Sequence, residues 1–305
     1  MNSEYTYDDI EPVALNEEQP QLCQILYTDQ FKSVMGTLLA LMKKNEYSDR
    51  ALALTGLGIE ILPSHYSIWI YRYNVIREIG KDLVDELDWL ETISLDNEKN
   101  YQIWNYRQLI IEQVIGTTGQ YNYHREFPIM AAMLSSDAKN HHVWTYRKWV
   151  VSRFGLFADE KENSFVEAMI EQDVRNNSAW NHRFYLKFGH EQGDAATSDV
   201  VDEELEYVKH KITVSPQNES SWNYLLGICN KFNISLQTLE GFCKQFVNDG
   251  TDSADEIELI KSSYALEVLA QVYNDDKSIL YYDLLSTKYD PIRKNYWQYM
   301  KSMLI

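Results

Sequence analysis

The hexapeptide QIWNYR at residues 102–107 decides the fold, because versions of it recur along the chain. The copies are SIWIYR (67–72), HVWTYR (142–147), SAWNHR (178–183), SSWNYL (220–225) and the weaker NYWQYM (295–300). Successive tryptophans lie 35, 40, 36 and 42 residues apart, and the last gap of 75 is about two repeats long. One copy has therefore lost its tryptophan, and a period of this length indicates two helices per repeat in an α-solenoid.

Within one repeat the two helices can be read directly from the pattern. Residues 82–93 carry apolar side chains at 83, 84, 87, 90 and 93, which is a helical stripe, and residues 94–100 are polar and predict a turn. A second helix is predicted from Tyr101 to Ile115, ended by Gly116. An asparagine stands four residues before the tryptophan in four copies, and we expect it to cap the second helix: Asn100, Asn140, Asn176 and Asn218.

Composition narrows the function classes. The 305 residues carry a formal net charge of −18, which repels phosphate backbones and disfavours nucleic acid as a partner. The acidity either serves solubility or favours cationic partners. The three cysteines form no CxxC, which fits a reducing compartment, and we expect a cytoplasmic protein without a membrane span. We expect residues 1–20 to be an extended acidic segment and residues 21–305 to form a single α-solenoid domain.

Basic and polar residues gather just before the tryptophans, in what we call the turn row. Stacked repeats bring these helix N-termini to one edge, where free N–H groups favour anions. Lys99, Lys139, His141 and His142 add basic groups there, and hydrogen-bond donors stand beside them: Tyr66, Tyr101 and Gln102. A phosphate or carboxylate is the natural ligand; the alternative is that lysine–asparagine is turn chemistry duplicated with the repeat. The tryptophans and their arginines are interpreted as scaffold.

A complete catalytic apparatus is missing from the sequence. It contains no HExxH and no spaced His/Cys set for a metal, no P-loop and no GxGxxG. The pairs Asp8-Asp9 and Asp275-Asp276 do not continue into the aspartate motif typical of helical isoprenoid-diphosphate enzymes. We therefore predict that this chain holds no metal.

The repeats resemble those of the protein prenyltransferase α subunit, as shared by farnesyltransferase and type I geranylgeranyltransferase. The resemblance covers nearly the whole chain; its motifs include YDDIEPV (7–13), ILYTDQF (25–31), KNYQIW (99–104), DVRNNS (173–178) and PQNESSWNYL (216–225). It implies an all-α fold, an α-α superhelix in the form of a crescent-shaped right-handed solenoid of about seven helical hairpins. This crescent is expected to wrap around a β subunit, an obligate partner that holds the catalytic Zn²⁺. The resemblance leaves open whether Mg²⁺ takes part.

The implied substrates are farnesyl or geranylgeranyl diphosphate and CaaX-box proteins such as small GTPases. By resemblance, Lys99 is the catalytic lysine and binds the diphosphate, together with Tyr101, Asn140 and His142. Gln102 would bind the C-terminal carboxylate of the CaaX peptide, and Tyr66 would line the peptide site. The alternatives are a non-enzymatic helical-repeat scaffold that binds peptides, and a self-sufficient isoprenoid-diphosphate enzyme.

Overall fold

The computed structural model describes residues 5–15, 22–23, 25–190, 198–247, 260–273 and 275–304. These residues form helices joined by turns, and within them β pairing is limited to one bridge between Val247 and Ile260. The all-α prediction is confirmed. Contacts divide the chain into two compact units, residues 1–150 and 151–305, and each is described by itself. The single domain expected for residues 21–305 stays a prediction.

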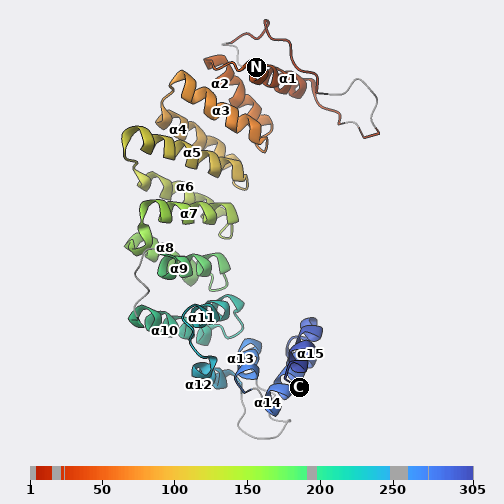
Figure 1. The fold of residues 1–305 in the computed structure, drawn as a ribbon, viewed down its shortest axis with the longest axis vertical. Helices are drawn as coiled ribbons and strands as arrows, with labels where there is room; N and C mark the ends of the chain where they lie inside the picture. Colours follow the sequence, from red (N-terminus) through yellow and green to blue (C-terminus); the bar gives the residue numbers. More distant parts are fainter. Residues whose placement is uncertain are drawn as a thin grey trace. The chain divides into compact units, whose positions relative to one another are not determined.

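The first unit is a stack of antiparallel helices in chain order (Figure 1). Helix α1 packs on α2, α2 on α3 and α4 on α5, while α3 also contacts α5. The helices of this unit are α1 (Asp29–Lys44), α2 (Asp49–Ile61), α3 (Tyr66–Ile79), α4 (Leu83–Asp96), α5 (Tyr101–Thr118), α6 (Glu126–Ser136) and α7 (His141–Phe154), the last of which runs past the unit boundary.

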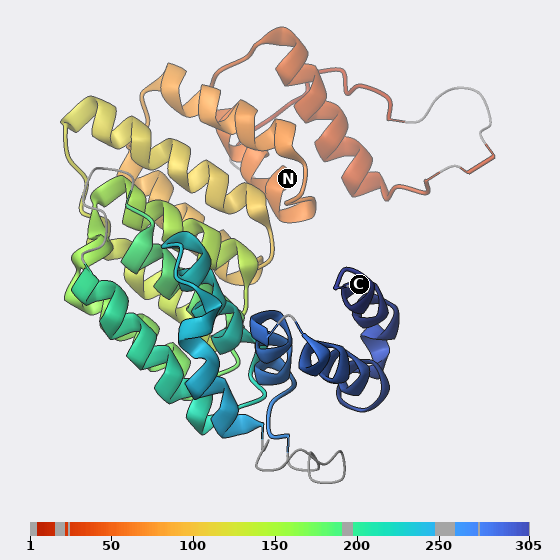
Figure 2. The same cartoon turned by 60° about the horizontal axis from the view of Figure 1, so that its bottom comes forward.

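The second unit continues the pairing, with α8 against α9, α10 against α11, and α13 against α14 (Figure 2). Helices α12 and α13 contact each other and lie between Trp222 and Trp297, where a repeat without a tryptophan is predicted. The helices are α8 (Glu160–Gln172), α9 (Asn177–Phe188), α10 (Ser198–Val214), α11 (Glu219–Lys231), α12 (Glu240–Cys243), α13 (Ser263–Tyr273), α14 (Asp276–Leu284) and α15 (Lys294–Ser302).

The asparagine caps are confirmed. The side-chain oxygens of Asn100 and Asn218 each accept from the backbone N–H two residues on, which satisfies a donor that the helix leaves free. The oxygens of Asn140 and Asn176 each accept from two such N–H groups. Each of the helices α5, α7, α9 and α11 therefore begins at the same distance before its tryptophan.

Two predicted helix ends are wrong. Helix α4 runs on to Asp96, because Ser94 turns its hydroxyl back onto the carbonyl of Leu90 (2.7 Å) and so fits inside a helix. Helix α5 passes through Gly116 and ends at Thr118, and the next residue, Gly119, has a φ of 77°, in the left-handed region that favours glycine. A single glycine inside a helix costs only about 1 kcal/mol, which packing readily offsets.

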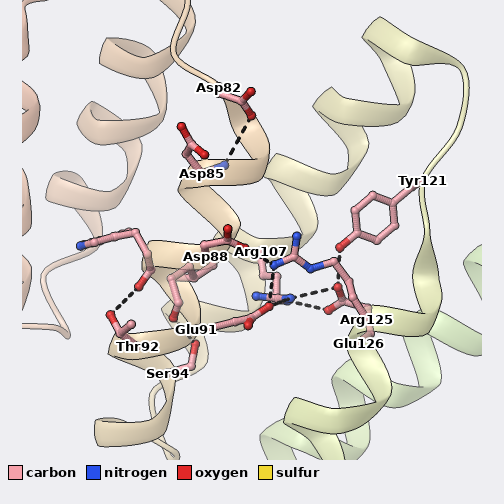
Figure 3. Close-up of polar contacts among 12 residues, drawn as sticks. Asp82, Asp85, Asp88, Glu91, Thr92, Ser94, Arg107, Tyr121, Arg125 and Glu126 are labelled. Carbon is pink, nitrogen blue, oxygen red and sulfur yellow. Dashed lines mark hydrogen bonds and ion pairs between the residues drawn. The ribbon is translucent and has the colours of Figure 1, made fainter.

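Four buried glutamates stand at matching places in successive repeats, and we call them the carboxylate ladder: Glu86, Glu126, Glu162 and Glu204. Arg72 pairs with Glu86 at 2.6 Å, and the hydroxyl of Tyr106 from the following repeat donates to the same carboxylate at 2.8 Å. The same arrangement joins Arg107 and Tyr146 to Glu126, and Arg183 and Tyr224 to Glu204. Figure 3 shows the pairing of Arg107 with Glu126. At Glu162 the ring of His182 replaces tyrosine, at 2.8 Å.

The repeat tryptophans pack between helices, as the scaffold interpretation predicts. The ring of Trp69 lies against Tyr106 of the next repeat, with 5.1 Å between centroids, and Trp180 lies against Tyr224 in the same way. The indole N–H of Trp69 donates to the carbonyl six residues earlier, as do those of Trp144, Trp180 and Trp222. The indole N–H of Trp104 has no hydrogen-bond partner among the described residues, although the ring is buried.

The N-terminal segment is described at residues 5–15, where no helix forms, and the rest of the predicted extended segment at 1–20 lies outside the described residues. The N–H of Val13 donates to the carbonyl of Gly36 in α1 (3.0 Å). A Cβ at Gly36 would come within 2.7 Å of the Val13 carbonyl oxygen, so this close approach requires glycine. The carboxylate of Asp9 pairs with Arg50 at 2.6 Å, which fastens the segment to α2.

Candidate functional site

Lys99 lies in the turn that leads into α5, at the edge of a hollow of about 610 Å³. The hollow is lined by the turn before α3, through Pro63 and Ser64, and by residues 95–101. Two neighbouring turns of the turn row therefore meet at one surface depression, as the stacking of repeats predicted. The hollow is large enough for a small anionic group, and Lys99 and Tyr101 line it together.

The ammonium group of Lys99 lies 3.2 Å from the carboxylate of Asp137 in the turn before α7. The other carboxylate oxygen of Asp137 accepts from the backbone N–H of Lys139 at 3.0 Å. That N–H and the charge of Lys99 together hold the pKa of Asp137 below its usual range, so it is ionised at neutral pH. Lys99 is thus paired with Asp137, an acid that the sequence-based prediction of an anion site left out.

Gln102 and Tyr101 form a pair at the start of α5. The amide of Gln102 donates to the hydroxyl of Tyr101 at 2.7 Å. Gln102 is 6% exposed, whereas Tyr101 is 60% exposed, so the buried amide fixes the direction of a ring that faces solvent. Tyr66, at the start of α3, is exposed as well, and its ring lies 6.4 Å from that of His65 between centroids.

Asn140 is buried and has two structural tasks. Its side-chain oxygen caps α7, and its side-chain nitrogen donates to the carbonyl of Glu98 at 2.9 Å. Glu98 precedes Lys99, so this bond ties the turn before α5 to the turn before α7. His142 is half-buried on the first turn of α7, and its ring lies 5.7 Å from that of His141 between centroids. Burial, and then His141, lower the pKa of His142 below 6.5, so His142 is neutral at pH 7.

The structure therefore brings together Lys99, Tyr101, Gln102 and Asn140 around two linked turns, with His142 on the helix that the second turn begins. Sequence reasoning missed Asp137 and the carboxylate ladder. A signal for the ladder was present: each of its glutamates stands 20 residues before the tyrosine or histidine that follows a repeat tryptophan by two. Asp137 likewise stands three residues before a cap asparagine, at the position that Asp173 holds in the next copy.

Among the described residues, no three His, Cys, Asp or Glu side chains gather into a set able to hold a metal ion. No described helix is long and apolar enough to cross a membrane. The groups that gather around these turns are an ammonium group, helix N-termini and oriented hydroxyl and amide donors.

Comparison with known proteins gives a consistent answer. The family described as "Protein prenyltransferase alpha subunit repeat" matches residues 83–114, 123–154, 159–186 and 201–232, one helix pair each. A Candida albicans protein named as the α subunit of protein farnesyltransferase/geranylgeranyltransferase type-1 is 55% identical over 99% of this chain and 98% of that protein. The chain belongs to the family of protein prenyltransferase α subunits.

Two further matches agree with this membership. A Schizosaccharomyces pombe protein with the same name is 38% identical, over 74% of this chain and 73% of its own length. A solved structure, Candida albicans protein geranylgeranyltransferase-I complexed with GGPP, contains a chain 54% identical to this one, with a TM-score of 0.92 and full coverage of both chains. The family resemblance deduced from the repeats and the α-subunit repeat fold are both confirmed.

Proposed function

We propose that this chain is the α subunit of a heterodimeric, cytoplasmic CaaX protein prenyltransferase. In this proposal it pairs with a β subunit and helps to transfer a farnesyl or geranylgeranyl group from its diphosphate to a cysteine thiol in a C-terminal CaaX box. The observation that carries the proposal is the likeness over nearly the full length to the Candida albicans protein named as the α subunit, at 55% identity. The paired turns around Lys99 add a surface with suitable chemistry.

Lys99 has the leading catalytic role. When the bond between C1 of the prenyl group and its oxygen breaks, negative charge builds on the departing diphosphate. An ammonium group held beside that oxygen stabilises the transition state more than the ground state, and so raises the rate. The hydroxyl of Tyr101 lines the same hollow and would donate to a diphosphate oxygen. His142 would bind as a neutral donor, while Asn140 acts through the helix start that it caps.

The peptide side of the site falls to Gln102 and Tyr66. An amide N–H of Gln102 would donate to the C-terminal carboxylate of the CaaX peptide. Because the Gln102 amide already bonds Tyr101, the peptide contact and the diphosphate contact would share one hydrogen-bonded pair. The exposed ring of Tyr66 offers apolar area to the peptide at the neighbouring helix start.

The zinc expected in this family finds no site among the described residues of this chain. By family resemblance, the proposal assigns Zn²⁺ to the β subunit, where it would hold the substrate thiol in its ionised form. The roles proposed for Lys99, Tyr101 and Gln102 do not depend on that ion.

Turnover by the chain alone and with a co-expressed β subunit tests the proposal. We expect transfer of a labelled prenyl group to a CaaX peptide only from the heterodimer. Activity of the isolated chain would contradict the proposal, and so would an inactive heterodimer that is correctly assembled. In the active heterodimer, Lys99→Ala should lower kcat at least about tenfold, because a donor at the developing charge is lost.

Arg175→Ala is the matched control for this substitution. Arg175 is exposed and occupies the same place in the turn before α9, where its N–H bonds Asp173 as that of Lys139 bonds Asp137. It should leave kcat near that of the unaltered heterodimer. Equal losses from Lys99→Ala and Arg175→Ala would rule out a specific catalytic part for Lys99.

A further inference from the structure

We propose that Asp137 sets how tightly the site binds diphosphate, by competing with it for the ammonium group of Lys99. This inference rests on the proposed function, because it takes the diphosphate to be the anion that Lys99 meets. In the absence of substrate, Lys99 is paired with Asp137 at 3.2 Å. A diphosphate therefore gains the lysine only at the expense of this ion pair.

The two partners differ in freedom. The carboxylate of Asp137 is fixed, because one of its oxygens accepts from the N–H of Lys139 at 3.0 Å and only about a third of the side chain is exposed. The Lys99 side chain is 76% exposed, and its only ion-pair partner among the described residues is Asp137. Lys99 can therefore swing from the acid to a ligand, whereas Asp137 cannot follow it.

Hydrogen bonds to the backbone also set the distance between the turn of Lys99 and the turn of Asp137. Asn140 caps α7 and bonds the carbonyl of Glu98, the residue before Lys99, at 2.9 Å. Asp137 lies three residues before Asn140, and its carbonyl accepts from the N–H of Asn140 at 3.0 Å. The turn that carries the lysine and the turn that carries its acid are thus tied together beside the ion pair, so the pair forms again whenever the ligand leaves.

The consequence is a weaker but readily reversible hold on diphosphates. Exposed ion pairs shift equilibria by about two- to fivefold, so losing the competitor should tighten diphosphate binding by about that factor. Asp137 should weaken the binding of the product, inorganic diphosphate, by the same factor, and so help to release it. In the next turn of this kind, Asp173 accepts from the N–H of Arg175 (2.9 Å), but Asp173 is not paired with Lys99 and does not line the hollow.

The test is Asp137→Asn in the heterodimer. An amide oxygen still accepts from the N–H of Lys139, so the turn is kept while the charge is removed. Dissociation constants for inorganic diphosphate and for the prenyl diphosphate are measured by calorimetry at one ionic strength, for the unaltered protein and for Asp137→Asn, Lys99→Ala and the double variant. Asp173→Asn, the same change in the turn before α9, is the control.

We expect Asp137→Asn to lower both dissociation constants about two- to fivefold in the presence of Lys99, and clearly less in the Lys99→Ala background. Asp173→Asn should change neither. Equal tightening in both backgrounds would mean that Asp137 acts only through its negative charge, and would overturn the inference, as would no tightening at all. Binding of inorganic diphosphate can be measured without turnover, so it tests the role of Asp137 alone. A heterodimer that fails to transfer prenyl groups would contradict the proposed function instead.

Discussion

The carboxylate ladder and the turn row belong to the same repeats but differ in how far the copies have diverged. The ladder keeps one chemistry: a buried glutamate bonded by a tyrosine or histidine 20 residues later. The turn row keeps its cap asparagine, but the residue before it varies: Lys99, Lys139, Arg175 and Gln217. Three of these acids, Glu86, Glu126 and Glu204, bond partners in two repeats, whereas the residue before each cap asparagine is exposed. The copies therefore differ at an exposed position, where variation costs little packing.

The ladder should carry the larger effect on stability. Arg107→Met removes the partner of Glu126 at 2.5 Å and leaves a buried carboxylate without its charge partner. The loss should be about 3–5 kcal/mol in the free energy of unfolding, measured by urea denaturation. Arg125→Met is the control: this arginine is more exposed and pairs with Asp88 and Glu91 (Figure 3), so we expect about 1 kcal/mol or less.

The pH dependence of that effect has a definite sign. Burial opposes ionisation of Glu126, but Arg107 and the hydroxyls of Tyr121 and Tyr146 lower its pKa below 4.5. A depressed carboxylate pKa contributes stability above the unfolded value that is lost as pH falls through the folded value. The difference between the unaltered chain and Arg107→Met should therefore shrink in acid below about pH 4.5, and a constant difference would contradict the buried pair.

The indole N–H groups of Trp104 and Trp180 differ in whether the preceding turn accepts a hydrogen bond from them. The N–H of Trp180 donates to the carbonyl of Val174 (2.8 Å), which also accepts from Asn218, whereas the N–H of Trp104 is buried without a partner in the described structure. Replacing each by phenylalanine removes similar volume but only one hydrogen bond. Trp180→Phe should cost at least about 1 kcal/mol more than Trp104→Phe in thermal unfolding. Equal losses of stability would mean that the hydrogen bond of the Trp180 indole does not stabilise the fold.

The smallest expected effect concerns His142. Burial and His141 lower its pKa, so the folded chain binds its proton less readily than the unfolded chain. His142 therefore contributes stability above the unfolded pKa of about 6.5, and that stability begins to be lost as pH falls below it. His142→Gln should flatten the fall in melting temperature between about pH 7 and pH 5. His124→Gln, at an exposed histidine, is the control. If His142→Gln leaves the dependence of melting temperature on pH unchanged, the lowered pKa of His142 is contradicted.

The sequence by itself determined the elements of this protein. The repeated tryptophan, the helix pairs and the asparagine caps are local, because a cap bonds an N–H only two or three residues away. The family resemblance also came from these motifs, and with it the site residues that remain proposals: Lys99, Tyr101, Gln102, Asn140, His142 and Tyr66.

Only the tertiary structure decided which side chains meet across repeats. Glu126 pairs with Arg107 of the preceding helix pair, and Asp137 lies 38 residues from Lys99 in the sequence, so neither partner follows from local spacing. The end of α5 was also settled by context, since Gly116 and Gly119 look alike in the sequence and only Gly119 takes a positive φ. Contacts between repeats depend on how the helices stack, and the burial of each charge depends on that stacking.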